Sequence, residues 1–256
     1  MIELLPVRFS RLKKMALSPK HYVSACAEEF EQTREMRIGT AVHRLVTGVG
    51  GQPVVYEGTR RGKAWEAFKA EYADKLIVNT TEWDTIQRCA ESVHAHPKAR
   101  ALLQAGGSIE REMEWTVFGL PARGTPDQFN EHFILDLKTT KFAQPQAFKR
   151  DAARRAYHAQ LDWYATGVEK ALGFRPEEAF IVAVETNPPY LTTVIQCSDE
   201  ILREGRRLWE NWFVRLQGCM ASGEYGGYNE EDNWWYPDTP GDLDLSGLTD
   251  EEEAAQ

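Results

Sequence analysis

The sequence predicts an α/β fold in which a mixed, mainly antiparallel central sheet is flanked by helices and preceded by a helical N-terminal region. Three patterns carry this prediction: amphipathic helical spacing over residues 1–105, three alternating apolar runs between 110 and 140, and two more strand-like runs between long helical segments. A chain of 256 residues suits one domain with a modest appendage. We predict one domain over 1–222, with its sheet and remaining helices in 106–222, and an acidic, flexible tail over 223–256.

Helical patterns dominate the first part of the chain. Residues 9–30 predict two short helices that separate at Ser18, which can cap a helix whose first turn contains Pro19. Gly39 and Thr40 lead into a helix over 41–46. After a Gly-rich loop, amphipathic spacing predicts two more helices, near 60–75 and 80–97.

The pattern changes to strands at Glu110. Alternating apolar residues over 110–118, 121–129 and 132–140 predict an antiparallel meander. The rest of the chain predicts a long helix, two strands turned at Asn187–Pro189 and a final helix, over residues 144–172, 179–186, 190–197 and 198–220.

The net charge of −9 is unevenly distributed. All 30 Lys and Arg residues lie at or before Arg215, whereas 11 of the 39 acidic residues lie beyond it. Residues 1–215 therefore hold 28 acids against 30 bases, a net charge of +2, which permits an anionic partner. We interpret the acidic tail as a solubilising segment; alternatively it docks a partner or mimics DNA, with an aromatic group formed by Trp234, Trp235 and Tyr236.

The sequence also predicts a cytoplasmic protein that does not enter a membrane. No apolar run approaches the roughly 18 residues of a membrane-spanning helix, and the N-terminus lacks the apolar region and cleavage site of a signal peptide. The cysteines show no C-x-x-C spacing, and we interpret them as reduced, mostly buried thiols: Cys26, Cys89, Cys197 and Cys219.

The third alternating run carries an acid and a lysine on one face, Asp136 and Lys138. If residues 131–132 form a two-residue hairpin loop, Asp127 lies directly opposite Asp136, with Cβ atoms about 4.5–5.5 Å apart. Two carboxylates that close repel each other unless a proton or a cation lies between them, and such oxygen ligands suit Mg²⁺. The lysine could then hold an attacking water or offset charge on a phosphate. Considered alone, such a pair is more often a weak surface ion pair.

Other segments complete a family pattern. Pro126–Asp127 followed by Asp136–Lys138 resembles the P-D…(D/E)-x-K signature of restriction-endonuclease-like nucleases. Gln160 and Tyr164, four residues apart in "QLDWY", resemble the Q-x-x-x-Y motif of the RecB-type branch, and "GTAVH" ends in His43 like its G-x-x-x-H motif.

Residues 10–22 add the spacing S-x-L-x(5)-S-P-x-x-Y, which is similar to a segment of the same branch. Together the motifs extend over about residues 8–197 and most resemble the RecE-like exonuclease VIII group. The resemblance implies a restriction-endonuclease-like core.

The resemblance also implies roles for individual residues. Metal ligands would be His43, Asp127, Asp136 and the backbone carbonyl of Leu137, and Lys138 would be catalytic. Gln160 and Tyr164 would position DNA or water. From the residues alone, His43 could instead be structural, and Tyr164 could belong to a core stripe with Tyr157 and Leu161. Glu112 and Glu114 could reach the metal or lie on a solvated strand face.

The implied activity is Mg²⁺-dependent exodeoxyribonuclease action, with Mn²⁺ able to substitute. The resemblance implies 5′→3′ digestion of one strand at duplex DNA ends, which leaves 3′ overhangs for a single-strand annealing partner, by a ring-shaped trimer or tetramer. It implies no iron–sulfur cluster, because the cysteine set of the cluster-bearing relatives is missing. A structure-specific or single-strand nuclease of the same fold, and an inactive DNA-end-binding scaffold, remain alternatives.

DNA contacts should come from basic residues spread along a track. We select five arginines inside or beside the motifs and on the long predicted helix: Arg11, Arg37, Arg123, Arg154 and Arg155. Solvated helix faces are the alternative interpretation of these positions.

Overall fold

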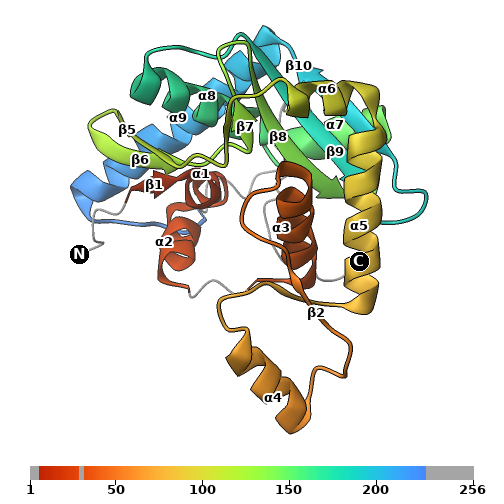
Figure 1. The fold of residues 1–256 in the computed structure, drawn as a ribbon. Helices are drawn as coiled ribbons and strands as arrows, with labels where there is room; N and C mark the ends of the chain where they lie inside the picture. The colour runs from red at the N-terminus through yellow and green to blue at the C-terminus, as the bar shows by residue number, and fades with distance from the viewer. Residues whose placement is uncertain (1–5, 29–31, 229–256) are drawn as a thin grey trace.

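The computed structural model describes residues 6–28 and 32–228, and a five-stranded mixed sheet lies at its centre (Figure 1). Its strands, in spatial order, are β10 (Thr192–Cys197), β9 (Glu178–Glu185), β8 (Phe133–Thr140), β7 (Gln128–Phe129) and β4 (Ser108–Ile109). β8 and β9 are parallel, and the other neighbouring pairs are antiparallel. The predicted mixed, mainly antiparallel sheet is thus confirmed.

The N-terminal helices separate where the sequence predicts. α1 (Phe9–Leu12) continues into the 3-10 turn η1 (Lys13–Ala16), and α2 (Pro19–Ala27) follows. Ser18 caps α2, because its hydroxyl oxygen accepts the backbone N–H of His21, and Pro19 occupies the first helical position.

The helix that carries the G-x-x-x-H motif is longer than predicted. α3 (Arg34–Thr47) begins at the Thr33 cap, so Gly39 lies inside the helix rather than before it. A Cβ atom at Gly39 would lie 3.2 Å from Oγ1 of Thr139 on β8. The glycine therefore allows α3 to approach the end of the central strand closely.

The two helices predicted near 60–75 and 80–97 are present, but the pattern missed three shorter elements nearby. The pattern did not reveal the short parallel pair β2 (Val54–Tyr56) and β3 (Ile77–Asn79), between which α4 (Gly62–Glu71) projects away from the sheet (Figure 1). The helix predicted near 80–97 is α5 (Thr80–Ala95), and a separate α6 (Pro97–Gln104) follows it. Pro97 starts α6 because it lacks the N–H that would continue α5.

The prediction of a single meander is wrong. A second sheet has the order β1-β6-β5, formed by β1 (Val7–Arg8), β6 (Leu120–Gly124) and β5 (Met113–Val117). The strand predicted over 121–129 breaks before β7 at Pro126, which cannot donate a ladder hydrogen bond. The strand predicted over 110–118 begins only at Met113, because Glu110 has a left-handed backbone with φ of 44°.

The predicted helix over 144–172 is two helices, α7 (Pro145–Arg154) and α8 (Tyr157–Leu172). They separate at Ala156, a buried residue with a left-handed φ of 57°. Neither Gly nor Pro marks this break in the sequence, so packing imposes it. The final helix α9 (Asp199–Ser222) lies close to α8, where a Cβ atom at Gly205 would come within 2.6 Å of the His158 carbonyl oxygen.

The core fills both faces of the central sheet. On one face, α3 packs against β8 and α5 packs against β9, and Val42, Ile86 and Leu135 belong to the apolar cluster between them. On the other face, α8 and α9 pack through Trp163 and Trp209. Because both faces of β8 are covered, the strand carries its polar residues into the interior.

Several sequence predictions concern other parts of the molecule. Each of the four cysteines is a free thiol, but only Cys89 is buried, so the prediction of mostly buried thiols is wrong. No helix within residues 6–28 and 32–228 is long and apolar enough to cross a membrane. The tail beyond residue 228, with its aromatic group, lies outside the described residues. The boundaries of the domain stay predictions.

Candidate active site

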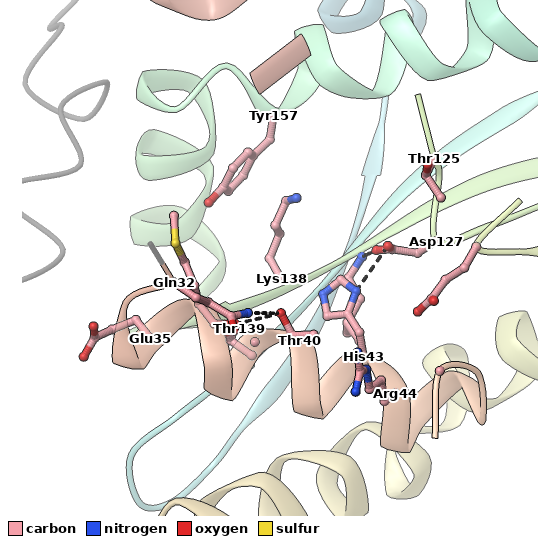
Figure 2. Close-up of a pocket in the computed structure, with 15 residues that line it drawn as sticks. Gln32, Glu35, Thr40, His43, Arg44, Thr125, Asp127, Lys138, Thr139 and Tyr157 are labelled. Carbon is pink, nitrogen blue, oxygen red and sulfur yellow. Dashed lines mark hydrogen bonds and ion pairs between the residues drawn. The ribbon is translucent and has the colours of Figure 1, made fainter. Parts of the chain in front are cut away.

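A cavity of about 600 Å³ opens between α3, the end of β8 and the start of α8 (Figure 2). Four of the residues predicted to act together line it: His43, Asp127, Leu137 and Lys138. They come from segments up to 95 residues apart in the chain, and only the fold brings them to one wall. Asp136, Gln160 and Tyr164 do not line the cavity. Asp136 and Gln160 contact Lys138, and Tyr164 contacts Gln160.

The strand register agrees with the predicted hairpin. Gln128 pairs with Leu135, and the N–H of Asn130 donates to the Phe133 carbonyl at 2.9 Å. The same register, continued by one residue, puts Asp127 opposite Asp136. Two carboxylates therefore face each other at the point where β7 and β8 separate.

Asp127 holds two groups of the cavity wall. Its Oδ1 lies 3.1 Å from Nδ1 of His43, and its Oδ2 accepts the backbone N–H of Leu137 at 2.5 Å. Burial alone would raise the pKa of Asp127, but His43, Lys138 and the Leu137 N–H together lower it below the usual range. Burial alone would lower the pKa of His43, but the Asp127 carboxylate raises it overall. The two side chains thus form an ion pair.

Asp136 and Lys138 form a second pair. Nζ of Lys138 lies 2.6 Å from Oδ2 of Asp136, which is only 2% exposed. Burial raises the pKa of Asp136, and Lys138 opposes that rise only in part. Burial alone would lower the pKa of Lys138, but Asp136, Tyr157 and Asp127 raise it well above its usual value. Lys138 is therefore an ammonium at neutral pH and acts as a hydrogen-bond donor.

A chain of hydrogen bonds fixes the lysine from behind. Nζ of Lys138 donates to Oε1 of Gln160 at 3.0 Å, and Nε2 of Gln160 donates to the Tyr164 hydroxyl at 3.0 Å. Burial raises the pKa of Tyr164 to about 12, so the phenol keeps its proton. Tyr164 also packs closely on Gly124, where a Cβ atom would lie 2.8 Å from its ring. Tyr164 therefore packs against the core cluster while its hydroxyl binds Gln160, and its role in positioning DNA or water stays a prediction.

The sequence missed Tyr157 as a residue of this site. Nζ of Lys138 lies 4.7 Å from the centre of the Tyr157 ring, and the ring lines the cavity. Tyr157 is the first residue of α8, directly after the left-handed Ala156. The sequence did not indicate a role for Tyr157 in the cavity, because the pattern predicts an unbroken helix over 144–172 in which Tyr157 belongs to the core stripe.

The side chains present fit a divalent cation by their chemistry. One imidazole, two carboxylates and a backbone carbonyl are suitable donors, and the buried Oδ2 of Asp136 has the Lys138 ammonium 2.6 Å away as its partner. No group of three His, Cys, Asp or Glu side chains has metal-binding geometry within residues 6–28 and 32–228. In this arrangement His43 and Lys138 supply the positive charge that neutralises the two carboxylates. A bound cation would replace part of these contacts.

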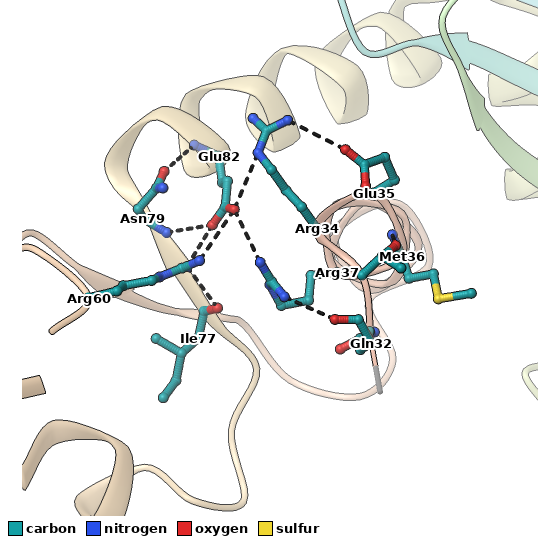
Figure 3. Close-up of polar contacts among 10 residues, drawn as sticks. Gln32, Arg34, Glu35, Met36, Arg37, Arg60, Ile77, Asn79 and Glu82 are labelled. Carbon is teal, nitrogen blue, oxygen red and sulfur yellow. Dashed lines mark hydrogen bonds and ion pairs between the residues drawn. The ribbon is translucent and has the colours of Figure 1, made fainter. Parts of the chain in front are cut away.

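Arg37, predicted to contact DNA, belongs to a cluster at the start of α3. Figure 3 shows three guanidinium groups around the buried carboxylate of Glu82: Nη2 of Arg60 at 2.7 Å, Nε of Arg34 at 3.6 Å and Nη2 of Arg37 at 3.7 Å. The cluster ties the N-terminus of α3 to α5. It therefore helps to hold the helix that carries His43.

The remaining predicted DNA contacts lie outside the cavity lining in the described structure. Arg123 pairs with Glu114 and, at 3.7 Å, with Glu112. Both glutamates are more than half exposed, which agrees with the solvated strand face rather than a metal site. The other positions are partly buried: Arg11 in α1, and Arg154 and Arg155, which both pair with Asp151.

The His43–Asp127 pair predicts how stability depends on pH in the metal-free protein. Folding raises the pKa of His43 above its ordinary 6.5, so its contribution is complete below about pH 6.5 and is lost as pH rises through the raised value. Folding lowers the pKa of Asp127 below 3.8, so its contribution is present above about pH 4 and is lost as pH falls. Urea unfolding in EDTA from pH 5 to 9 should show the stability difference between wild type and His43→Gln narrowing as pH rises. A difference that stays constant would contradict the ion pair.

The mixed sheet, the flanking helices and the Asp127, Asp136 and Lys138 constellation define a PD-(D/E)xK-type nuclease fold. The chain belongs to the family described as "PDDEXK-like domain of unknown function (DUF3799)", whose model matches residues 8–233. No curated protein sequence matches the chain.

One solved structure shares the fold. A candidate exonuclease from Eubacterium rectale is 14% identical, with a TM-score of 0.65 over 94% of this chain and 92% of that chain. A phage-related exonuclease from Haemophilus somnus 129PT is 13% identical over 87% of this chain and 98% of that chain. Its TM-score of 0.36 is too low to carry a structural argument.

Proposed function

We propose that this protein is a metal-dependent exodeoxyribonuclease that hydrolyses phosphodiester bonds at the ends of duplex DNA. The observation that carries the proposal is the convergence of His43, Asp127 and Lys138 on one cavity, with Asp136 paired to the lysine at 2.6 Å. A scaffold without activity would not need two facing carboxylates beside a buried ammonium, because such a group is costly to bury.

Mg²⁺, with Mn²⁺ able to substitute, would be held by His43, Asp127, Asp136 and the carbonyl oxygen of Leu137. When bound, the ion supplies an acidified water and stabilises the leaving oxygen. Lys138 donates hydrogen bonds to the attacking water or to a phosphate oxygen, because its raised pKa keeps it protonated. Gln160 orients the ammonium, and Tyr164 orients Gln160.

The finer proposal is 5′→3′ resection that leaves 3′ overhangs for a single-strand annealing protein. It rests on the motif resemblance, as does a ring-shaped trimer or tetramer around the duplex. Arg11, Arg37, Arg123, Arg154 and Arg155 would contact the phosphate backbone, and those now paired with carboxylates would exchange them for phosphates. Light scattering of the purified chain tests the ring, and a monomer with full processivity would contradict it.

Digestion of a linear duplex labelled separately at its 5′ and 3′ ends tests the activity. With Mg²⁺ or Mn²⁺ we expect early release of the 5′ label and a persistent 3′ label, and with EDTA we expect neither. Single strands, flapped duplexes and a nicked circle serve as comparison substrates.

The alternatives give different results in the same assay. Faster cleavage of single strands or flaps would favour a structure-specific nuclease of this fold. Binding of duplex ends without cleavage at any divalent-ion concentration would favour the scaffold and contradict the enzyme.

A further inference from the structure

Arg44 is a cavity residue that no motif includes. It follows His43 on α3, and the two side chains line the same cavity (Figure 2). Successive residues of an α-helix differ by about 100° in direction. Arg44 therefore reaches a different part of the cavity from the Asp127 carboxylate that His43 contacts.

The loop after α3 holds the Arg44 side chain in place. A Cβ atom at Gly50 would lie 3.1 Å from Nε and 3.2 Å from Cγ of Arg44, so the side chain packs directly over this glycine. Gly50 also has a left-handed φ of 86°, which favours glycine independently. The Gly-rich loop thus forms a support for a partly buried guanidinium.

The guanidinium has no counter-ion in the described parts of the chain. Apart from His43, the cavity lining has one other basic residue, Lys138, and it is paired with Asp136. The two further cavity acids are engaged elsewhere: Glu35 lies 3.8 Å from Arg34, and Glu110 accepts a hydrogen bond from Thr47 at 3.4 Å. Within residues 6–28 and 32–228, no hydrogen bond or ion pair uses the guanidinium of Arg44. A partly desolvated guanidinium of this kind is suited to an anion that arrives with the ligand.

We propose that Arg44 binds a non-scissile phosphate of the nucleic acid, the one next to the phosphodiester that is cut. This inference rests on the proposed function, because the scissile phosphate must lie at Asp127, Asp136 and Lys138. The planar fork of an arginine matches two phosphate oxygens, so the contact fixes how far the strand advances into the cavity. Arg44 is thus a substrate-positioning residue.

Substitution Arg44→Gln tests the contact, with Arg100→Gln on exposed α6 as the control that removes the same charge. Two substrates are compared: duplex DNA, and thymidine 5′-p-nitrophenyl phosphate, which has a single phosphodiester and no neighbouring phosphate. We expect the ratio of kcat/KM for duplex to kcat/KM for the ester to fall about 10- to 100-fold in Arg44→Gln. The control should leave this ratio unchanged. An equal loss on both substrates would overturn the proposal.

A modified substrate locates the contact. A duplex with one uncharged methylphosphonate at the phosphate next to the cut should slow the wild-type protein as much as Arg44→Gln does. The variant should lose nothing further on that duplex, because the same contact is already absent. If the rate losses caused by the methylphosphonate and by Arg44→Gln multiply when the two are combined, that phosphate is not the one that Arg44 binds.

Binding in EDTA separates this inference from the proposed function. If the wild type cuts no substrate, the proposed function fails, but the phosphate contact can still be measured. Arg44→Gln should reduce the slope of log affinity against log salt concentration by about 0.9, and Arg100→Gln should not. An unchanged slope in Arg44→Gln would overturn the contact.

Discussion

Lys138→Met should reduce hydrolysis of duplex DNA by about 10²- to 10³-fold or more, with little change in binding to DNA ends. Methionine has similar length but no charge, so it cannot donate to the attacking water or to a developing negative charge. Lys138 is also the point where Asp136, Gln160 and Tyr157 meet, at 2.6 Å, 3.0 Å and 4.7 Å. Single-turnover cleavage at saturating enzyme measures the chemical step without the binding step.

The matched control is Lys170→Met, an exposed lysine at the far end of α8. It removes the same charge at a position that does not line the cavity, so its cleavage rate should equal that of the wild type. Cleavage by Lys138→Met within tenfold of the wild type would show that the ammonium is not needed. Loss of folding in Lys138→Met is checked by circular dichroism, because the substitution leaves the buried Asp136 without its partner.

The second large effect concerns stability. Asp162→Ala should lower the free energy of unfolding by about 3 kcal/mol or more. The Asp162 carboxylate is 1% exposed, accepts the Trp209 indole N–H at 2.8 Å and Nε of Arg206 at 3.2 Å, and pairs with Arg175. Its removal leaves the buried indole N–H unsatisfied and two cations without their shared anion. The hydrogen bonds of Asp162 join α8, the helix that carries Gln160, to α9.

Urea unfolding of Asp162→Ala and of Glu169→Ala tests this expectation. Glu169 also pairs with Arg175 but is 45% exposed, so its loss should cost less than about 1 kcal/mol. Asp162→Asn keeps an acceptor for the indole and should fall between the two. A change below about 1 kcal/mol in Asp162→Ala would show that the buried network contributes little.

Local patterns predicted the parts of this fold that depend on neighbouring residues. Alternation along residues 133–138 identified β8 and put Asp136 and Lys138 on one face, because side chains in a strand point alternately to opposite sides. The Ser18 and Pro19 pair marked the start of α2, because capping needs only atoms within one turn. A two-residue loop set the register that brings Asp127 opposite Asp136.

The motif residues were likewise visible in the sequence, because their chemistry limits the residue types that can serve. His43, Asp127, Leu137 and Lys138, to which the resemblance gives roles in one site, all line one cavity, and those roles stay predictions. The sequence did not predict the distances between these residues or the direction of their pKa shifts. It also did not predict the hydrogen bonds that link Lys138 through Gln160 to Tyr164. These depend on how deeply α8 and β8 are buried against each other.

Long-range packing produced the features that local patterns missed. The predicted meander divides between two sheets because strand pairing depends on which edges meet after the chain has collapsed. Ala156 takes a left-handed backbone only because its buried surroundings require the turn, and that turn brings Tyr157 over Lys138. Nothing in the sequence distinguishes Arg44 from other helix arginines, and only the tertiary structure places it over Gly50 in the cavity wall. Local sequence thus specified most of the helices and strands and the reactive side chains. Contacts between distant segments set the burial, the charge states and the partners of these side chains, because only such contacts remove the side chains from water.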